Sequence, residues 1–241
     1  MPPYPAALFA CVALCMSTPA LALRFVTEDY PPFNMLEENQ VSGISTLILR
    51  EALSRAQLSA EFELLPWARA LAMARSQPQT CVYSAVRSAE REKQGHKWVG
   101  PLVDDRISLF ARVDSKIKLR TLGEARNYRV GGYVADAYGD YVERQGVRLD
   151  RAPADLMNLP KLMAGRIDLW VAGSISGAYK AKREGYQHDV KLLLSGGEPR
   201  DSQMWLACNR AVPDALISSL NEAVKSVHAD GTAARFAARY H

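Results

Sequence analysis

The sequence predicts an α/β protein made of two lobes that are joined by two strands. After residue 22, apolar segments alternate between the periods of strands and of helices. The alternation falls into two runs, each long enough for one α/β unit. A longer alternating segment, 104–114, separates the runs, and a second, 202–211, follows the second run. Because no Gly/Ser-rich linker accompanies these crossings, we expect two hinge strands with a cleft between the lobes.

The first 22 residues, MPPYPAALFACVALCMSTPALA, predict a secretory signal peptide. They carry no charged side chain, and Ala20-Leu21-Ala22 fits the small-x-small pattern of a cleavage site. The usual Lys or Arg ahead of the apolar stretch is missing, which leaves a buried N-terminal helix as the alternative. The stretch is shorter than the ~20 residues that span a membrane. We therefore expect cleavage near Ala22 and export to the periplasm.

The first run has the order strand, helix, strand, helix, strand. We expect strands over 23–28, 60–65 and 80–86, and helices over 43–56 and 66–77. Ser42 or Ser45 is the expected cap of the first helix, and Pro66 suits the first position of the second. A short charged helical run follows Ser88. The βαβαβ order predicts parallel strands with right-handed crossovers.

The same pattern restarts after the first crossing. We expect strands over 128–132, 147–152, 167–173 and 189–195, and helices over 121–126, 136–145, 154–166 and 176–185. An amphipathic helix over 213–232 and a short helical tail follow the second crossing. The predicted domains are the signal peptide (1–22), lobe 1 (23–106 and 207–241) and lobe 2 (107–206).

Cysteine usage and charge narrow the function. Two of the four cysteines lie in the leader, so the exported protein keeps Cys81 and Cys208. In an oxidising compartment these two residues favour a disulfide, although two unrelated buried thiols remain the alternative. The net charge of +4 is dispersed, which argues against nucleic-acid binding.

Motifs for catalysis or cofactors are scarce. The four histidines are scattered without ligand spacing. The run GSISG at 173–177 has Ile175 where a nucleophile elbow needs Ser, and no phosphate-binding or dinucleotide loop occurs. The sequence therefore predicts no enzyme, no metal and no cofactor.

Aromatic and polar residues recur where predicted strands end. Ligands of open α/β sheets bind outside the carboxyl ends of the strands, so these residues are candidates for a ligand site, although each one alone also fits a structural role. The candidates are Glu28, Tyr30, Phe33, Trp67, Arg69, Ser84, Arg87, Arg91, Asp136, Trp170 and Ser174.

At these residues the chain resembles the bacterial extracellular solute-binding proteins of family 3, the polar amino-acid type of periplasmic receptor for ABC importers. The resemblance rests on YPPF after the first strand, RSAEREK and WVGPL before the first crossing, LMAGRIDLWVAG in the second run, and ADGTAARFAARY at the end. It implies the type II periplasmic-binding-protein fold. It also implies a monomer that captures an amino acid, or a related carboxylate or amine, and presents it to an ABC-type permease.

The resemblance also assigns roles to residues. Arg91 matches the arginine that holds the ligand's α-carboxylate, a task that suits a two-pronged guanidinium. Ser84 matches the hydroxyl that assists it, and Tyr30 matches the aromatic that stacks on the ligand. Arg87 stands where the family usually has an apolar residue, so the resemblance gives it no role.

Two positions depart from the family. Asp136 stands where a Thr commonly donates to the ligand carboxylate, and a carboxylate there would repel an anionic group. Gly173 aligns with the aspartate that holds the α-ammonium, so an ordinary amino acid needs another acceptor, for which Glu28, Asp29 and Asp136 are available. Two further functions stay open on this scaffold: a dehydratase-like enzyme with Glu28 or Asp136 as general acid, and a sensor that works without a transporter.

Overall fold

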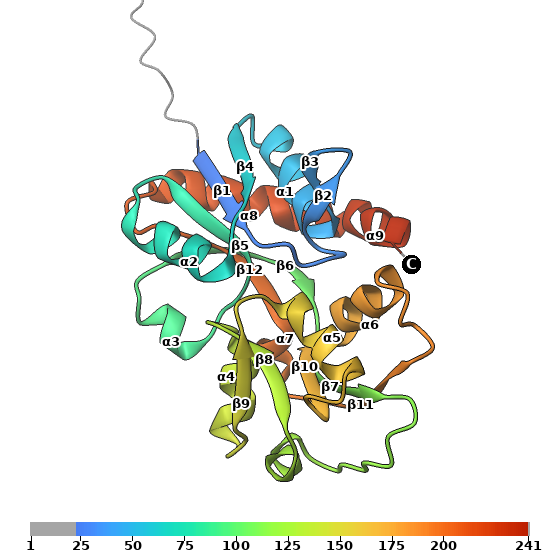
Figure 1. Cartoon of the computed structure of the whole chain (residues 1–241). Helices are drawn as coiled ribbons and strands as arrows, with labels where there is room; N and C mark the ends of the chain where they lie inside the picture. The colour runs from blue at the N-terminus through green and yellow to red at the C-terminus, as the bar shows by residue number, and fades with distance from the viewer. Residues whose placement is uncertain (1–22, 241) are drawn as a thin grey trace, which may run out of the picture.

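The computed structural model describes residues 23–240, so the predicted signal peptide lies outside the described residues. The chain forms two lobes, drawn above and below the crossing strands in Figure 1, each built on a mixed five-stranded sheet. The prediction of an α/β fold with two lobes is confirmed.

Lobe 1 is built on the sheet β4-β1-β5-β12-β6. Its three parallel strands are the predicted ones, and β12 runs antiparallel between β5 and β6. The strands are β1 (Leu23–Thr27), β4 (Ala60–Leu64), β5 (Thr80–Val86), β6 (Lys97–Asp104) and β12 (Gln203–Cys208), with a hairpin of β2 (Met35–Glu37) and β3 (Gln40–Ser42). The helices are α1 (Ile44–Arg55), α2 (Trp67–Ser76), α3 (Ala89–Glu92), α8 (Asp214–Ala229) and α9 (Thr232–Ala237), followed by the 3-10 turn η3 (Ala238–Tyr240).

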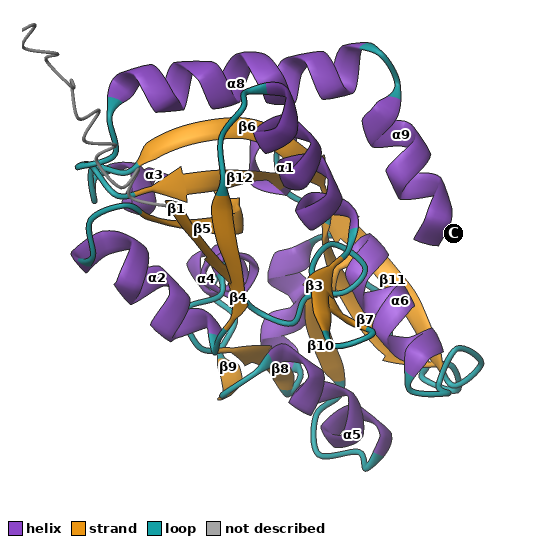
Figure 2. Ribbon diagram, turned by 90° about the horizontal axis from the view of Figure 1, so that it is seen from above, coloured by secondary structure: helices purple, strands orange, loops and turns teal. Residues whose placement is uncertain are grey.

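Both faces of the lobe 1 sheet are covered by helices, as Figure 2 shows from above. Phe25 on β1 belongs to the core that includes residues of α1 and α8, whereas the neighbouring Val26 packs in a second cluster with Trp67 of α2. Successive strand residues point to opposite faces, so a strand buried on both sides reads as a continuous apolar run.

Lobe 2 is built on the sheet β11-β7-β10-β8-β9. Here β10, β8 and β9 are parallel, and β7 is antiparallel to both β10 and β11. The strands are β7 (Ile107–Arg112), β8 (Val130–Tyr133), β9 (Leu149–Ala152), β10 (Leu169–Gly173) and β11 (Val190–Gly196). The helices are α4 (Ala137–Arg144), α5 (Asn158–Met163), α6 (Ser174–Arg183) and α7 (Pro199–Ser202), with 3-10 turns η1 (Leu122–Asn127) and η2 (Asp155–Met157).

The chain crosses between the lobes twice, first between β6 and β7 and then between β11 and β12. The backbone N–H of Asp105 in the first crossing donates to the carbonyl of Ser202 in the second, at 2.9 Å. Residues 203–206, which the sequence assigned to lobe 2, pair with β5 and β6 in the lobe 1 sheet. The two crossings therefore lie side by side and form one hinge.

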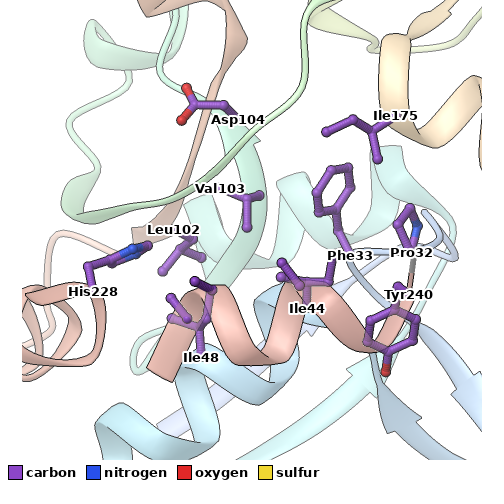
Figure 3. A pocket seen from close by; sticks show the side chains of 13 residues that line it. Pro32, Phe33, Ile44, Ile48, Leu102, Val103, Asp104, Ile175, His228 and Tyr240 are labelled. Carbon is purple, nitrogen blue, oxygen red and sulfur yellow. The ribbon is translucent and has the colours of Figure 1, made fainter. Parts of the chain in front are cut away.

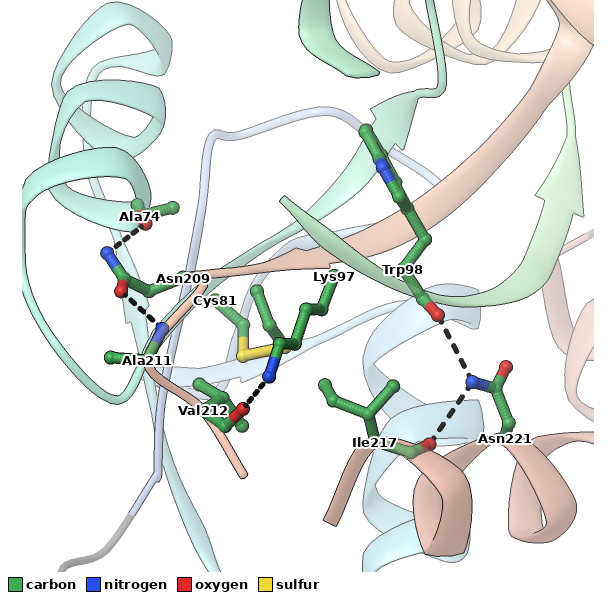
Figure 4. The surroundings of a disulfide bond; sticks show 10 residues. Ala74, Cys81, Lys97, Trp98, Asn209, Ala211, Val212, Ile217 and Asn221 are labelled. Atoms are coloured by element: carbon green, nitrogen blue, oxygen red, sulfur yellow. Dashed lines mark hydrogen bonds between the residues drawn. A yellow bond between two sulfur atoms is a disulfide. The ribbon is translucent and has the colours of Figure 1, made fainter. Parts of the chain in front are cut away.

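Cys81 and Cys208 form a disulfide, as the sequence predicted. They are paired residues on the adjacent strands β5 and β12, and both are fully buried. Figure 4 shows the bond among hydrogen bonds of the neighbouring segments, such as the one from the Asn209 amide to the carbonyl of Ala74. The disulfide closes a loop with a sequence separation of 127 residues, which corresponds to about 5 kcal/mol of stabilisation on the chain-entropy model.

The start of α1 differs from the prediction. Neither Ser42 nor Ser45 caps the helix; the N-cap is Gly43, which has φ of 106° and no side-chain cap bond. A Cβ on Gly43 would lie 2.6 Å from the carbonyl carbon of Phe33. The close approach of the YPPF loop therefore requires glycine at this position, which a pattern of capping residues does not reveal.

Candidate functional site

The carboxyl ends of the parallel strands in the two lobes face one another across a cleft. In lobe 1, β1 leads to Glu28 and Tyr30, and β4 leads to Trp67. In lobe 2, β8 ends at Tyr133 and is followed by Asp136 at the start of α4. This is the arrangement that the recurrence of polar and aromatic residues at strand ends predicted.

Direct hydrogen bonds join the two lobes across this cleft. The Tyr133 hydroxyl donates to Oε1 of Glu28 at 2.8 Å. The carbonyl of Ala135 in lobe 2 accepts from Nε1 of Trp67 at 2.9 Å and from Nη2 of Arg91 at 3.0 Å. The lobes are therefore closed on one another in this structure.

A small cavity remains between the closed lobes. Its volume is about 20 Å³, little more than one water molecule needs. The lining combines two carboxyl groups, one guanidinium and four aromatic side chains. The lining residues are Glu28, Tyr30, Trp67, Ser84, Val86, Arg91, Tyr133, Asp136, Ala137, Tyr138 and Met204. We call this space the central cavity. An amino-acid-sized solute needs the lobes to separate before it can enter.

Arg91 is the cation of the central cavity. Only 7% of the residue is exposed, although it stands on the four-residue helix α3. Its guanidinium donates to the carbonyls of Val86 and Ala135, both at 3.0 Å, and lies 5.3 Å from the ring centre of Trp67. No carboxylate of the described residues lies within 4.0 Å of it. Burial lowers the pKa of Arg91, while neighbouring acidic groups partly offset this.

The two carboxyl groups of the central cavity have raised pKa values. Burial is the main cause for both. The pKa of Glu28 rises to about 8, although the charge of Lys180 and the hydrogen bond from Tyr133 oppose the rise. The pKa of Asp136 rises to about 7, helped by the charge of Asp155 and opposed by the backbone N–H groups of α4. Both acids therefore lack enough positive charge nearby to stay fully ionised at neutral pH.

Hydrogen bonds and local backbone conformation orient the side chains of Asp136 and Ser84. Asp136 is the N-cap of α4, and its carboxyl accepts from the N–H groups of Tyr138 and Gly139 at 3.0 and 2.8 Å. Ser84 has φ of 57° and its hydroxyl donates to Oδ1 of Asn34 at 2.5 Å. A serine in this left-handed conformation within β5 is unusual, and it turns the side chain toward the cavity.

Asp105, in the first crossing, closes the N-terminus of α6. Its carboxyl accepts from the hydroxyl of Ser174 at 3.2 Å and from the N–H groups of Ile175 and Ser176 at 2.7 and 3.2 Å. The Tyr30 hydroxyl of lobe 1 also donates to it, at 3.3 Å. Burial raises the pKa of Asp105 to about 6, against the opposing effect of these N–H donors.

The Asp105 carboxylate has room at the start of α6 because residue 173 is a glycine. A Cβ on Gly173 would overlap the carboxylate of Asp105. The position at which the resemblance implies an ammonium-binding aspartate thus has no side chain, and a carboxylate from the hinge occupies the adjacent space. Asp105 accepts from four donors, one in lobe 1 and three in lobe 2, and so links the hinge to both lobes.

Lys180 of α6 is a second buried cation, next to the central cavity. Its side chain has no exposed surface and its ammonium pairs with the buried carboxylate of Asp155. Nε1 of Trp170 donates to the other oxygen of Asp155 at 2.7 Å. The Lys180 ammonium also lies over the ring of Tyr30 in lobe 1, 3.8 Å from its centre.

Several residues predicted for the site do not line the central cavity. Arg69 is exposed on α2. Trp170 is fully buried in the core of lobe 2, and Ser174 contacts Asp105 rather than the cavity. Arg87 lies between the rings of Trp98 and Trp205, at 5.6 and 5.2 Å, and pairs with Glu92.

Phe33 points into a separate apolar pocket of about 300 Å³ at the side of lobe 1. Figure 3 shows Phe33 there beside Ile44 and Ile48 of α1, with Ile175 of lobe 2 at the rim. This pocket is distinct from the central cavity. The aromatic pair of the YPPF loop is thus divided between the two, although Tyr30 and Phe33 stack on each other with ring centres 6.0 Å apart.

Sequence reasoning missed Tyr133, Tyr138, Asp105, Lys180 and Asp155. Tyr133 ends the strand VGGY, three residues before the predicted Asp136, so its position at a strand end was a usable signal. Burial raises the pKa of both tyrosines well above the ordinary value, which keeps them neutral hydrogen-bond donors. Lys180 lies in the charged run YKAKRE and carries no such signal.

The described residues contain no group of three or more His, Cys, Asp or Glu that is arranged to hold a metal ion. Within residues 23–240, no helix is both long enough and apolar enough to cross a membrane.

Two α/β lobes that close on a cavity of buried ionisable groups and aromatic rings define a two-lobed solute-binding scaffold. The family model for bacterial extracellular solute-binding proteins, family 3, matches residues 23–241, and the chain belongs to this family.

Solved structures share the fold at low identity. An ancestral arginine-binding protein bound to arginine has 20% identity and a TM-score of 0.77, over 91% of this chain and 97% of that one. A histidine kinase sensor domain has 19% identity and a TM-score of 0.78, over 91% and 96%. A Salmonella typhimurium periplasmic binding protein with high arginine specificity has 15% identity and a TM-score of 0.76, over 90% and 98%. No curated protein sequence matches the chain.

Proposed function

We propose that the protein is a periplasmic receptor that binds a small polar solute, an amino acid or a related carboxylate or amine, between its lobes. It acts as a monomer and delivers the solute to an ABC-type permease. Family membership and the closed two-lobed fold support the binding role. The permease, the export and the solute itself are parts of the proposal that experiments must test.

The buried arginine and the two buried carboxyl groups of the central cavity are the main support for this proposal. Arg91, Glu28 and Asp136 all face the cavity, and within residues 23–240 none of them has an oppositely charged side-chain atom within 4.0 Å. A buried guanidinium without a counter-charge is costly, and so is keeping a buried carboxyl protonated above its ordinary pKa. A polar solute would repay this cost by placing an anionic group on Arg91 and hydrogen-bond donors on the two carboxyls.

Hinge motion gives the solute access. The crossings meet at Asp105, and the hydrogen bonds between the lobes involve few side chains, so the lobes can separate about this point. Closing the cleft over a solute excludes water and strengthens each charged hydrogen bond.

One observation favours a second function. The pKa of Glu28, near 8, keeps this acid protonated at neutral pH, as a general acid requires. A dehydratase-like enzyme on this scaffold therefore remains the alternative. Turnover of a candidate hydroxy acid by purified protein, lost in Glu28→Gln, would favour it.

Thermal unfolding in the presence of a solute panel tests the receptor. The panel contains amino acids, polyamines, small organic acids and short peptides, and a bound solute raises the melting temperature. A panel without any shift would contradict the proposal.

The two arginines supply a matched pair of variants for the solute found. Arg91→Ala should abolish binding because Arg91 faces the cavity, whereas Arg87→Ala should leave affinity within about threefold because Arg87 lies between Trp98 and Trp205. The reverse result would mean that the solute binds in a separate pocket of about 600 Å³ that Arg87 and Trp205 line.

A further inference from the structure

The ring of Tyr30, where the family resemblance places a stacking contact with the ligand, already carries a cation. The Lys180 ammonium lies 3.8 Å from the ring centre, well within the range of a cation–π contact. Lys180 belongs to α6 of lobe 2 and Tyr30 to lobe 1. The contact therefore spans the cleft, as a bound ligand would.

Lys180 is held in this place by a complete local environment. Asp155 supplies its counter-charge, and Trp170 orients Asp155 through a hydrogen bond of 2.7 Å. The side chain of Lys180 is fully buried and that of Asp155 is 2% exposed. A lysine buried this deeply without a partner would be strongly destabilising, so the pair is a built part of the site rather than a surface contact.

Lys180 also stabilises the ionised form of the acidic groups around Tyr30. Its charge acts on Glu28 and on Asp105, in each case favouring the ionised carboxylate. Both acids contact the cleft aromatics, Glu28 through Tyr133 and Asp105 through Tyr30. Lys180 thus supplies positive charge to a ring and two acids at once, which is the set of contacts an ammonium ion seeks.

Gly173 removes the other contact an incoming ammonium would need. No side chain is present at position 173, and the Asp105 carboxylate beside it already accepts from four donors. An ammonium on Tyr30 would therefore meet Lys180 as a like charge and find no free carboxylate at position 173.

We propose that Lys180 is a specificity-determining residue whose own ammonium occupies the cation–π position over the ring of Tyr30, so that the receptor rejects solutes that bring an ammonium group to this ring. The inference rests on the proposed receptor function, because it concerns the same site. It narrows the solute to molecules that engage Arg91 while offering no ammonium to Tyr30.

Chemical rescue of a Lys180 variant by a small ammonium ion tests the role of Lys180. Lys180→Ala removes three carbons and the nitrogen, which n-propylammonium matches in length and charge. The matched control is Lys182→Ala, an exposed lysine on the same helix. Melting temperatures are measured for the wild type and both variants with n-propylammonium chloride, and with 1-propanol as the uncharged analogue at equal ionic strength.

We expect n-propylammonium to raise the melting temperature of Lys180→Ala saturably, by a few degrees, and to leave the wild type and Lys182→Ala unchanged. Adding Tyr30→Leu to Lys180→Ala should reduce the shift, which places the probe on the ring. The proposal is overturned if 1-propanol works equally well, if the wild type responds to the same extent, or if Lys180→Ala folds and does not respond.

The double variant Lys180→Ala/Asp155→Asn keeps the test possible if Lys180→Ala alone does not fold. Lys180→Ala leaves Asp155 buried without its partner, and Asp155→Asn removes that charge. If only the double variant folds, a saturable shift with n-propylammonium and none with 1-propanol supports the proposal, and equal responses overturn it. A solute panel that fails on the wild type contradicts the receptor function without affecting this readout, and a failed rescue leaves the receptor function standing.

Discussion

Replacing Glu28 by Gln should stabilise the protein at neutral pH. The pKa of Glu28 is raised from 4.5 to about 8, chiefly by burial. At pH 7 the folded protein must keep this acid protonated, 2.5 pH units above its ordinary pKa, which costs about 3 kcal/mol at ~1.4 kcal/mol per unit. Gln is neutral at every pH, and its carbonyl oxygen can still accept from the Tyr133 hydroxyl.

The pH dependence gives the sign of the effect. Because the folded state binds more protons than the unfolded state between about pH 4.5 and 8, wild-type stability falls as the pH rises through this window. At pH 5 the cost is below about 1 kcal/mol. We expect Glu28→Gln to raise the free energy of unfolding by about 1–3 kcal/mol at pH 7 and by much less at pH 5, since opening of the cleft relieves part of the cost.

Urea unfolding followed by tryptophan fluorescence at both pH values measures this. Glu61→Gln, at an exposed position on β4, is the control and should change little. An increment for Glu28→Gln that is absent at pH 7, or equal at pH 5 and pH 7, would refute the reasoning that burial dominates this site.

Two further predictions concern the frame of the site. The double variant Cys81→Ser/Cys208→Ser should lose about 2–5 kcal/mol of unfolding free energy in denaturant titration; an unchanged midpoint in the wild type with and without reductant would contradict this. Gly173→Ala should lose at least about 2 kcal/mol because its methyl group overlaps the carboxylate that caps α6. Gly173 has φ of −70°, so this loss comes from the overlap and not from backbone strain. Gly185→Ala, where a Cβ meets nothing within 4 Å but φ is 80°, shows the cost of strain without overlap.

The regular part of the fold was predictable from the sequence. The alternation of periods in 23–86 gave three parallel strands and their helices because burial on both faces of a sheet leaves a strong apolar signal. The hairpin β2–β3 was missed because each strand has only three residues, and one residue of the six is fully buried, which leaves little of that signal.

Most of the cavity residues that the sequence predicted stand in the loop or helix that follows a strand; Ser84, which lies inside β5, is the exception. Glu28, Tyr30, Trp67, Arg91 and Asp136 all reach the central cavity for this reason. Which contacts they make remained beyond a sequence argument.

Lys180 and Asp105 show why the other residues of the site were not predicted from the sequence. Each looks like an ordinary charged residue of a helix or a crossing, and each is buried only because the partner that neutralises or hydrogen-bonds it comes from elsewhere in the chain. For Asp105, Gly173 was a usable signal, since a missing side chain in an aligned site position leaves room for a group from another segment.

The disulfide has a topological consequence. Cys81 precedes the first crossing and Cys208 follows the second, so the whole of lobe 2 is an insertion within one covalently closed ring. A protease that cuts a loop of lobe 2 once will leave the two fragments joined. The nicked chain should migrate as one species on a denaturing gel and as two after reduction, and lobe 1 should keep both halves of its sheet together while lobe 2 is opened.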